Sequence, residues 1–127
     1  MRRLAICFAL ILLFTAISLC GLAARPPQEQ NNTPMSFTGE LTDNVCAAQH
    51  SHDAMIKKEG FKGSKDCTLG CVKSGGQFVL YAPANNTTYR LDDQEKPSGF
   101  AGQRVTIIGT YDGATKTIHI QSIQSAP

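Results

Sequence analysis

The sequence has no strong excess of charge of either sign. Its 127 residues include 12 lysines and arginines against 10 aspartates and glutamates, and only 17% of the residues are charged. Two of the basic residues, Arg2 and Arg3, lie in a segment that we expect to be removed, so the mature chain would be formally neutral. A neutral chain has no basic field that concentrates it on nucleic acid, and we expect no nucleic-acid partner.

Several motifs of enzymes are also missing. The sequence contains no Gly-rich phosphate loop, no Cys-x-x-Cys redox pair and no Ser-His-Asp order with a nucleophile elbow. Asp92, Asp93 and Glu95 are close in sequence but lack the glycine-centred spacing of a calcium loop, so we expect a solvated acidic turn there. These absences favour a domain without enzymatic activity, and catalysis by a cysteine is the weakest interpretation.

One long apolar run, residues 4–19, follows a short basic start and precedes small residues that end at Ala24. This pattern is typical of a secretory signal peptide over residues 1–24, with cleavage after Ala23 or Ala24. The run of about 16 residues is shorter than the roughly 20 that a spanning helix needs. We therefore expect a secreted or periplasmic protein with no transmembrane span in its mature form. Cys20 leaves a lipid anchor open as an alternative, although Leu19 stands where a lipoprotein signal has a small residue.

Residues 25–35 are polar and rich in proline, which predicts a flexible linker. The foldable domain is then 36–124, about 90 residues, and a domain of this size has a modest core. A covalent or metal cross-link would add useful stability to such a small core.

Alternating apolar residues predict five short strands, at 36–43, 77–82, 87–92, 104–111 and 116–123. Asn85-Asn86 and Asp112-Gly113 are turn signals that predict two hairpins. Between the first two strands, residues 44–75 show a helical pattern: Asp43 can cap one helix that ends at Gly60, and a second helix can follow from about Ser64. The predicted fold is mainly β with a helical insert, a five-stranded barrel like the OB-fold, because closure removes exposed strand edges.

Four short motifs carry a resemblance to a known family. The stretch 39–123 resembles a family of small bacterial secreted proteins with no established function. The motifs are Gly39-x-Leu41-x-Asp43-x-x-Cys46, Cys67-x-x-x-Cys71-Val72, Phe78-Val79-Leu80 and Phe100-Ala101-Gly102. The resemblance implies a compact OB-like barrel and implies no chemistry. The helical insert follows the first strand, whereas the helix of the usual OB-fold follows the third.

The helical insert holds three cysteines and two histidines. Cys46 and His50 are four residues apart, as are Cys67 and Cys71, and residues at this spacing share one face of a helix. The four side chains together would suit tetrahedral zinc, and soft thiolates would also suit copper(I). His52 and Met55 are further candidate ligands. A zinc or copper site is therefore the alternative to a domain without a cofactor.

A disulfide is the competing interpretation. Cys46 can pair with Cys67 or with Cys71, and closing a loop of about 20 to 25 residues would stabilise the fold by roughly 3 kcal/mol. Cys67 and Cys71 are the least favourable pair, because residues one helical turn apart strain the geometry of a disulfide. One disulfide leaves one thiol over, and the three thiols can also all stay reduced and buried. The sequence does not decide which of these holds, nor does it identify a ligand or partner.

The aromatic residues and the third histidine have structural interpretations. Tyr81, Tyr89 and Tyr111 can form a ligand platform with Phe78, but in so small a domain we expect them to complete the core or the barrel rim. His119 alternates with Ile118 and Ile120 in the last strand, so we expect its side chain on the solvent face.

Overall fold

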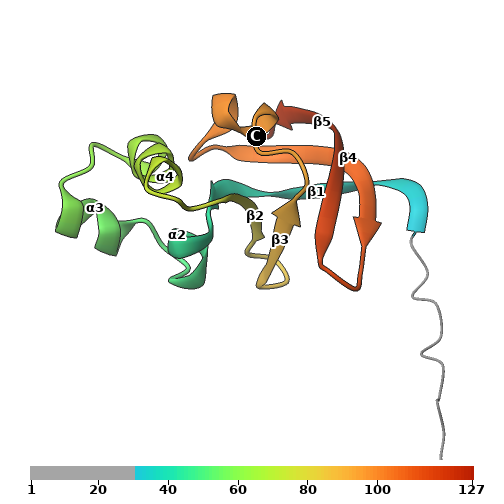
Figure 1. Cartoon of the computed structure of the whole chain (residues 1–127), viewed down its shortest axis with the longest axis horizontal. Coiled ribbons are helices and arrows are strands. Elements are labelled where there is room, and N and C mark those ends of the chain that lie inside the picture. Colours follow the sequence, from blue (N-terminus) through green and yellow to red (C-terminus); the bar gives the residue numbers. More distant parts are fainter. Residues whose placement is uncertain (1–30) are drawn as a thin grey trace, which may run out of the picture.

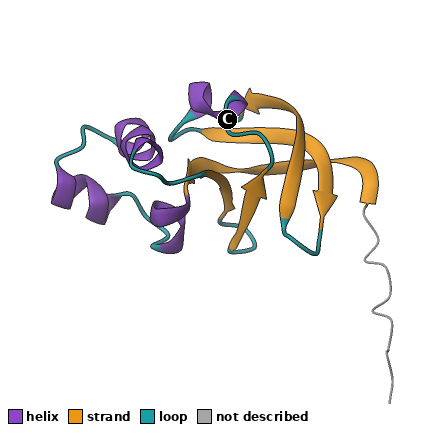
Figure 2. Ribbon diagram, in the orientation of Figure 1, coloured by secondary structure: helices purple, strands orange, loops and turns teal. Residues whose placement is uncertain are grey.

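Five strands close into a barrel in the computed structural model, which describes residues 31–127 (Figures 1 and 2). In chain order the elements are β1 (Asn31–Asp43), α2 (Asn44–Ala48), α3 (Asp53–Glu59), α4 (Ser64–Lys73), β2 (Phe78–Ala82), β3 (Thr87–Leu91), a 3-10 helix (Lys96–Phe100), β4 (Arg104–Asp112) and β5 (Thr117–Ser125). The strand order is β1-β2-β3-β5-β4, and β1 pairs with β4 to close the barrel. Among the paired strands, β3 and β5 are parallel to each other, and the other four pairs are antiparallel. The predicted OB-like barrel with helices between the first two strands is confirmed.

The first strand is longer than the sequence pattern indicated. β1 begins at Asn31, so residues 31–35 of the predicted linker belong to the strand. Residues 32–36 are exposed, yet Met35 lies opposite Gly109 in β4. A strand pairs through backbone groups, which do not need apolar side chains, and a pattern of side chains therefore missed this extension. The predicted signal peptide with Cys20, and residues 25–30 of the predicted linker, lie outside the described residues.

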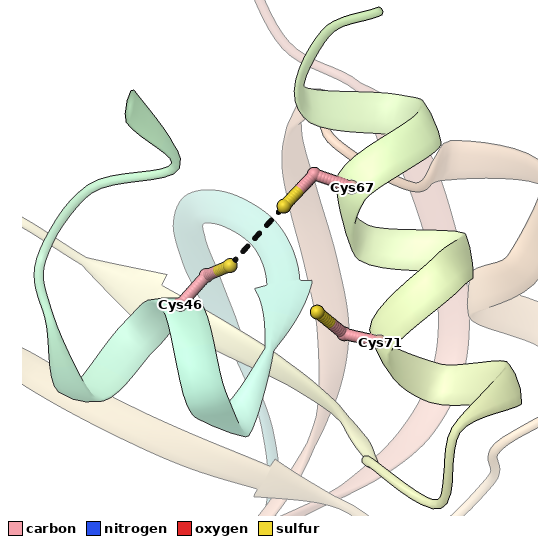
Figure 3. Close-up of side chains that lie close together, drawn as sticks. All are labelled: Cys46, Cys67 and Cys71. Carbon is pink, nitrogen blue, oxygen red and sulfur yellow. Dashed lines mark hydrogen bonds between the residues drawn. The ribbon is translucent and has the colours of Figure 1, made fainter. Parts of the chain in front are cut away.

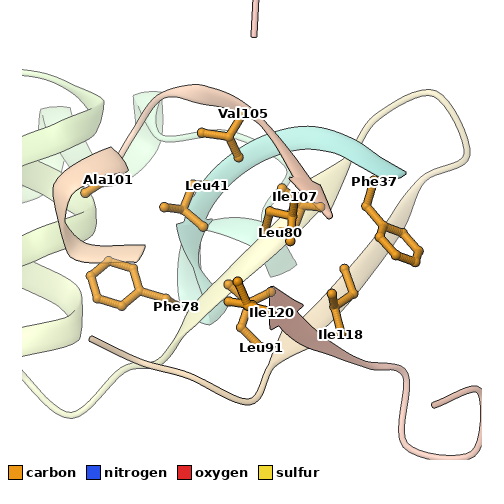
Figure 4. Close-up of a cluster of buried hydrophobic side chains, with 10 residues drawn as sticks. All are labelled: Phe37, Leu41, Phe78, Leu80, Leu91, Ala101, Val105, Ile107, Ile118 and Ile120. Atoms are coloured by element: carbon orange, nitrogen blue, oxygen red, sulfur yellow. The ribbon is translucent and has the colours of Figure 1, made fainter. Parts of the chain in front are cut away.

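The barrel interior is filled by apolar side chains from every strand (Figure 4). The buried cluster consists of Phe37, Leu41, Phe78, Leu80, Leu91, Ala101, Val105, Ile107, Ile118 and Ile120. Tyr89 and Tyr111 are half-buried, and their rings contact Phe37 with centroids 5.3 and 5.8 Å away. The expectation that these two tyrosines complete the core is confirmed.

The three helices gather at one end of the barrel (Figure 1). Asp43 caps α2 as predicted, because its Oδ1 accepts hydrogen bonds from the backbone N–H groups of Val45 and Cys46. Gly60 ends α3 in the left-handed conformation, also as predicted. The expectation of one helix from Asp43 to Gly60 is wrong, because α2 ends at Ala48 and α3 begins at Asp53. None of the helices in residues 31–127 has the length and apolar character needed to span a membrane.

Candidate functional site: a buried cluster of three thiols

Two helices bring the three cysteines together. Cys46 lies in α2, where the Asp43 cap starts the helix directly after β1. Cys67 and Cys71 lie one turn apart in α4, which runs alongside α2 (Figure 3). The side chains of all three residues point into the space between the two helices. The prediction that Cys67 and Cys71 share one face of a helix is confirmed by this arrangement.

The sulfur atoms form a tight triangle. Cys46 Sγ and Cys67 Sγ are 3.5 Å apart, and all three Sγ atoms lie within 4.8 Å of one another. Cys46 and Cys67 are buried, whereas Cys71 is half-buried. The 3.5 Å separation is far longer than the bond of about 2.05 Å in a disulfide, and all three cysteines are free thiols. The structure shows no disulfide among these three cysteines, and the pairing of Cys46 with Cys67 or Cys71 stays a prediction.

His50 does not join the thiols. It follows the end of α2, where its backbone φ of 54° turns the chain away from the helix. Its Nδ1 is 3.0 Å from the hydroxyl of Tyr81, and the two rings contact each other with centroids 5.3 Å apart. The structure thus separates His50 from the other three residues of the predicted four-residue metal set. The i,i+4 argument fails for Cys46 and His50 because the helix ends between them.

His52 occupies a more central position than the sequence indicated. Its ring is buried, and its Nε2 lies 2.9 Å from the hydroxyl of Thr42 in β1 and 3.1 Å from that of Thr68 in α4. Its Nδ1 is 3.0 Å from Glu40 Oε1, and because a carboxylate only accepts, Nδ1 donates there. His52 therefore links the α2–α3 loop to β1 and to α4. From the sequence, His52 was only a further candidate metal ligand, because no local pattern predicts its contacts with Thr42 and Thr68.

Asp43 has a feature beyond the predicted helix cap that the sequence did not show. The side chain is completely buried beside the thiols, and one of its oxygens, a nitrogen of His52 and Cys46 Sγ lie within 4.8 Å of one another. Its Oδ1 is occupied by the helix cap. Within residues 31–127 its Oδ2 is the buried side-chain oxygen or nitrogen atom that lacks a hydrogen-bond partner. Buried polar atoms of this kind are rare in native proteins and call for an explanation.

The environment keeps the thiols of Cys46 and Cys71 protonated. Burial raises the pKa of the Cys71 thiol from 9.0 to about 11, and the nearby Asp43 carboxylate and Cys67 add to the effect. Burial also raises the pKa of Cys46 well above its ordinary value, with further contributions from the neighbouring Asp43 carboxylate and Cys67. A thiol attacks as the thiolate, so these two thiols are poor nucleophiles at neutral pH.

The raised pKa of Cys71 predicts an unusual pH dependence of its alkylation. In the reduced chain, with a chelator present, the rate with iodoacetamide is expected to rise about tenfold per pH unit until the pH approaches the pKa of about 11. The rate constant at Cys71 can be followed by peptide mass spectrometry, with an unstructured cysteine peptide as the control. A plateau near pH 9, where the control levels off, would contradict the half-buried position of this thiol.

A groove leads to the half-buried thiol. It has a volume of about 400 Å³, and its lining includes Cys71, Val45, Met55 and Phe61. The other two thiols do not line it. Cys71 is therefore the member of the cluster that a reagent or an ion reaches first from this groove.

The remaining candidate residues have structural roles. His119 lies on the exposed side of β5, as predicted, with its Nδ1 3.1 Å from Asp92 Oδ2. Asp93 accepts hydrogen bonds from the backbone N–H groups of Glu95 and Lys96, which lower the pKa of its carboxyl. The acidic residues after β3 thus lie in the turn that leads into the 3-10 helix.

Residues 70–126 match a family model described as a protein of unknown function (DUF5818). This match covers β2 to β5 and the end of α4, so it includes Cys71 but neither Cys46 nor Cys67. No curated protein and no solved structure matches the chain. The chain is therefore similar, over its barrel strands β2 to β5, to a family that has no assigned function.

Proposed function

We propose that this chain is an exported, non-enzymatic domain with a binding or structural role, in which the three-thiol cluster fastens the helical segment 44–75 to the barrel. The observation that carries the proposal is the triangle of Cys46, Cys67 and Cys71, which joins α2 directly to α4 within 4.8 Å. Export is supported by the signal-peptide pattern over residues 1–24. Secretion or passage into a periplasm follows from that pattern.

The helical segment needs such a fastening because its own packing is sparse. α3 buries none of its residues, and α4 buries only Cys67 and Thr68. By contrast, the barrel has a continuous apolar core. A segment with few buried apolar contacts opens locally at a low free-energy cost, and contacts at the thiols and at His52 therefore decide whether it stays docked.

The raised pKa values of Cys46 and Cys71 support a structural role over a catalytic one. A formally neutral mature chain supports a partner other than nucleic acid.

Amide hydrogen exchange tests the fastening. Cys67→Ala is expected to speed exchange in residues 44–75 by at least about tenfold, equivalent to about 1.4 kcal/mol, while the barrel strands keep their protection. Leu69→Ala is the matched control, since it shortens an exposed side chain of the same helix. If Cys46→Ala, Cys67→Ala and Cys71→Ala all leave the exchange of this segment unchanged, the three thiols do not fasten it and the proposal fails.

A further inference from the structure

We infer that Cys46, Cys67 and Cys71 form a zinc site with Asp43 as the fourth donor. This inference rests on the proposed fastening role and specifies its chemistry: one ion would bind α2, α4 and the end of β1 together. It differs from the four-residue set suggested by spacing alone, because Asp43 takes the place of His50.

The spacing of the sulfur atoms fits one shared ion. Zinc–sulfur bonds are about 2.3 Å long, so two sulfurs of a tetrahedral site are separated by about 3.8 Å. The Cys46–Cys67 separation of 3.5 Å is close to this value, and the other two separations lie within 4.8 Å. The cluster can therefore surround an ion with only small movements of the side chains. The same sulfur atoms would need a larger approach, to about 2.05 Å, to form a disulfide.

The unpartnered oxygen of Asp43 supplies the second, independent observation. Asp43 Oδ2 is completely buried and lacks a hydrogen-bond partner within residues 31–127, while a carboxylate oxygen of Asp43 lies within 4.8 Å of Cys46 Sγ. A carboxylate oxygen is an ordinary zinc ligand. Coordination would thus account for an atom that the fold otherwise leaves unsatisfied.

Charge and ligand type favour zinc over copper(I). Three thiolates and one carboxylate bring four negative charges into a buried space, and a divalent ion offsets more of them than a monovalent one. Copper(I) favours soft sulfur ligands and gains little from a carboxylate oxygen. The histidines nearby are occupied, His52 by Thr42, Thr68 and Glu40, and His50 by Tyr81.

The ion has a route into the site. Cys71 lines the groove of about 400 Å³, so an ion can meet this thiol first and then the two buried ones. Binding replaces protons: each thiol transfers its proton to the buffer as its sulfur bonds to the ion, and no electron is transferred. The reaction needs neither an oxidant nor a reductant, and it uses all three thiols, whereas a disulfide leaves one over.

Zinc binding to the purified, reduced chain tests this inference. After metal removal under anaerobic conditions, the chain is titrated with zinc chloride, desalted, analysed for zinc and alkylated. We expect one equivalent of zinc and protection of all three thiols. Cobalt(II) as a spectroscopic probe is expected to give the strong absorption of a tetrahedral site with sulfur ligands. Cys71→Ser, the mildest thiol change because this residue is half-buried, should weaken zinc affinity by more than about 100-fold.

Two further variants test the fourth donor. Asp43→Asn keeps the helix cap, since asparagine caps as well as aspartate, but removes the carboxylate, and it should weaken zinc affinity by at least about tenfold. His50→Ala should leave the affinity unchanged. Equal zinc affinity in the Asp43→Asn variant and the unmodified chain would overturn the assignment of Asp43. Preference for copper(I) over zinc, with no effect of Asp43→Asn, would overturn it as well.

The outcomes separate this inference from the fastening role. A chain that retains no zinc but forms a Cys46–Cys67 disulfide in oxidant, with protected amides in residues 44–75, would overturn the zinc site and leave the fastening intact. If amide exchange in this segment is the same with and without zinc and in all three thiol variants, the fastening itself fails.

Discussion

Replacement of His52 by alanine is expected to lower the free energy of unfolding by about 2–6 kcal/mol. The ring is buried, and its Nε2 is the side-chain partner of Thr42 in β1 and of Thr68 in α4. Both threonines are themselves buried, so the variant leaves two hydroxyl groups without this partner, and each such group costs about 1–3 kcal/mol. A cavity the size of an imidazole adds to the loss.

His50→Ala is the matched control, because the same residue type lies two positions earlier on an exposed turn. Its contact with the Tyr81 hydroxyl is solvent-accessible, and surface substitutions of this kind usually change stability by less than about 0.5 kcal/mol. Urea denaturation of the two variants and the unmodified chain measures the difference. Equal midpoints for His52→Ala and His50→Ala would show that the buried network contributes nothing to stability.

The barrel could be predicted from the sequence because its signals are local. Asn85-Asn86 and Asp112-Gly113 mark the two hairpins, and alternation of apolar residues marks the strands that these turns connect. The Asp43 cap and the Gly60 stop are local as well, since each acts on backbone groups within a few residues. Each of these signals acts over a distance of a few residues, which a single sequence can show.

The break between α2 and α3 could not be predicted in the same way. Residues 47–50 contain neither glycine nor proline, so the helical pattern predicts continuation through them. Instead, His52 is drawn into a buried position by partners 10 and 16 residues away. Ser51 then accepts a hydrogen bond from the backbone N–H of Asp53 at the start of α3. Tertiary contacts override the local preference, and the loss of His50 from the predicted metal set follows directly from this break.

The candidate site shows the same division between local and distant information. The i,i+4 spacing correctly placed Cys67 and Cys71 on one face of α4, which is a local property. Their approach to Cys46 depends on how α4 docks against α2 and the end of β1, which is a property of the whole fold. The Asp43 cap was predicted, but its second, unpartnered oxygen became evident only when the surrounding side chains were in place.

Gly39→Ala is expected to lower the free energy of unfolding by about 3 kcal/mol, at the upper end of the usual cost of overpacking. Gly39 pairs with Val105 in β4, and its neighbour Glu40 pairs with both Arg104 in β4 and Tyr81 in β2. β1 therefore changes partners at this point of the barrel. A Cβ at residue 39 would collide with the backbone carbonyl of Tyr81, and this carbonyl can move only if β1 and β2 separate.

The matched control is Gly99→Ala, at an exposed position of the 3-10 helix before β4. A Cβ there meets no atom within 4 Å, and the backbone does not require a positive φ. This variant is expected to stabilise the chain by up to about 1 kcal/mol, because alanine restricts the unfolded chain more than glycine does. Guanidinium denaturation of both variants measures the contrast. If Gly39→Ala were as stable as Gly99→Ala, the close approach of β1 to β2 would not limit residue 39, and the presence of glycine in the Gly39-x-Leu41-x-Asp43 motif would need a reason other than barrel closure.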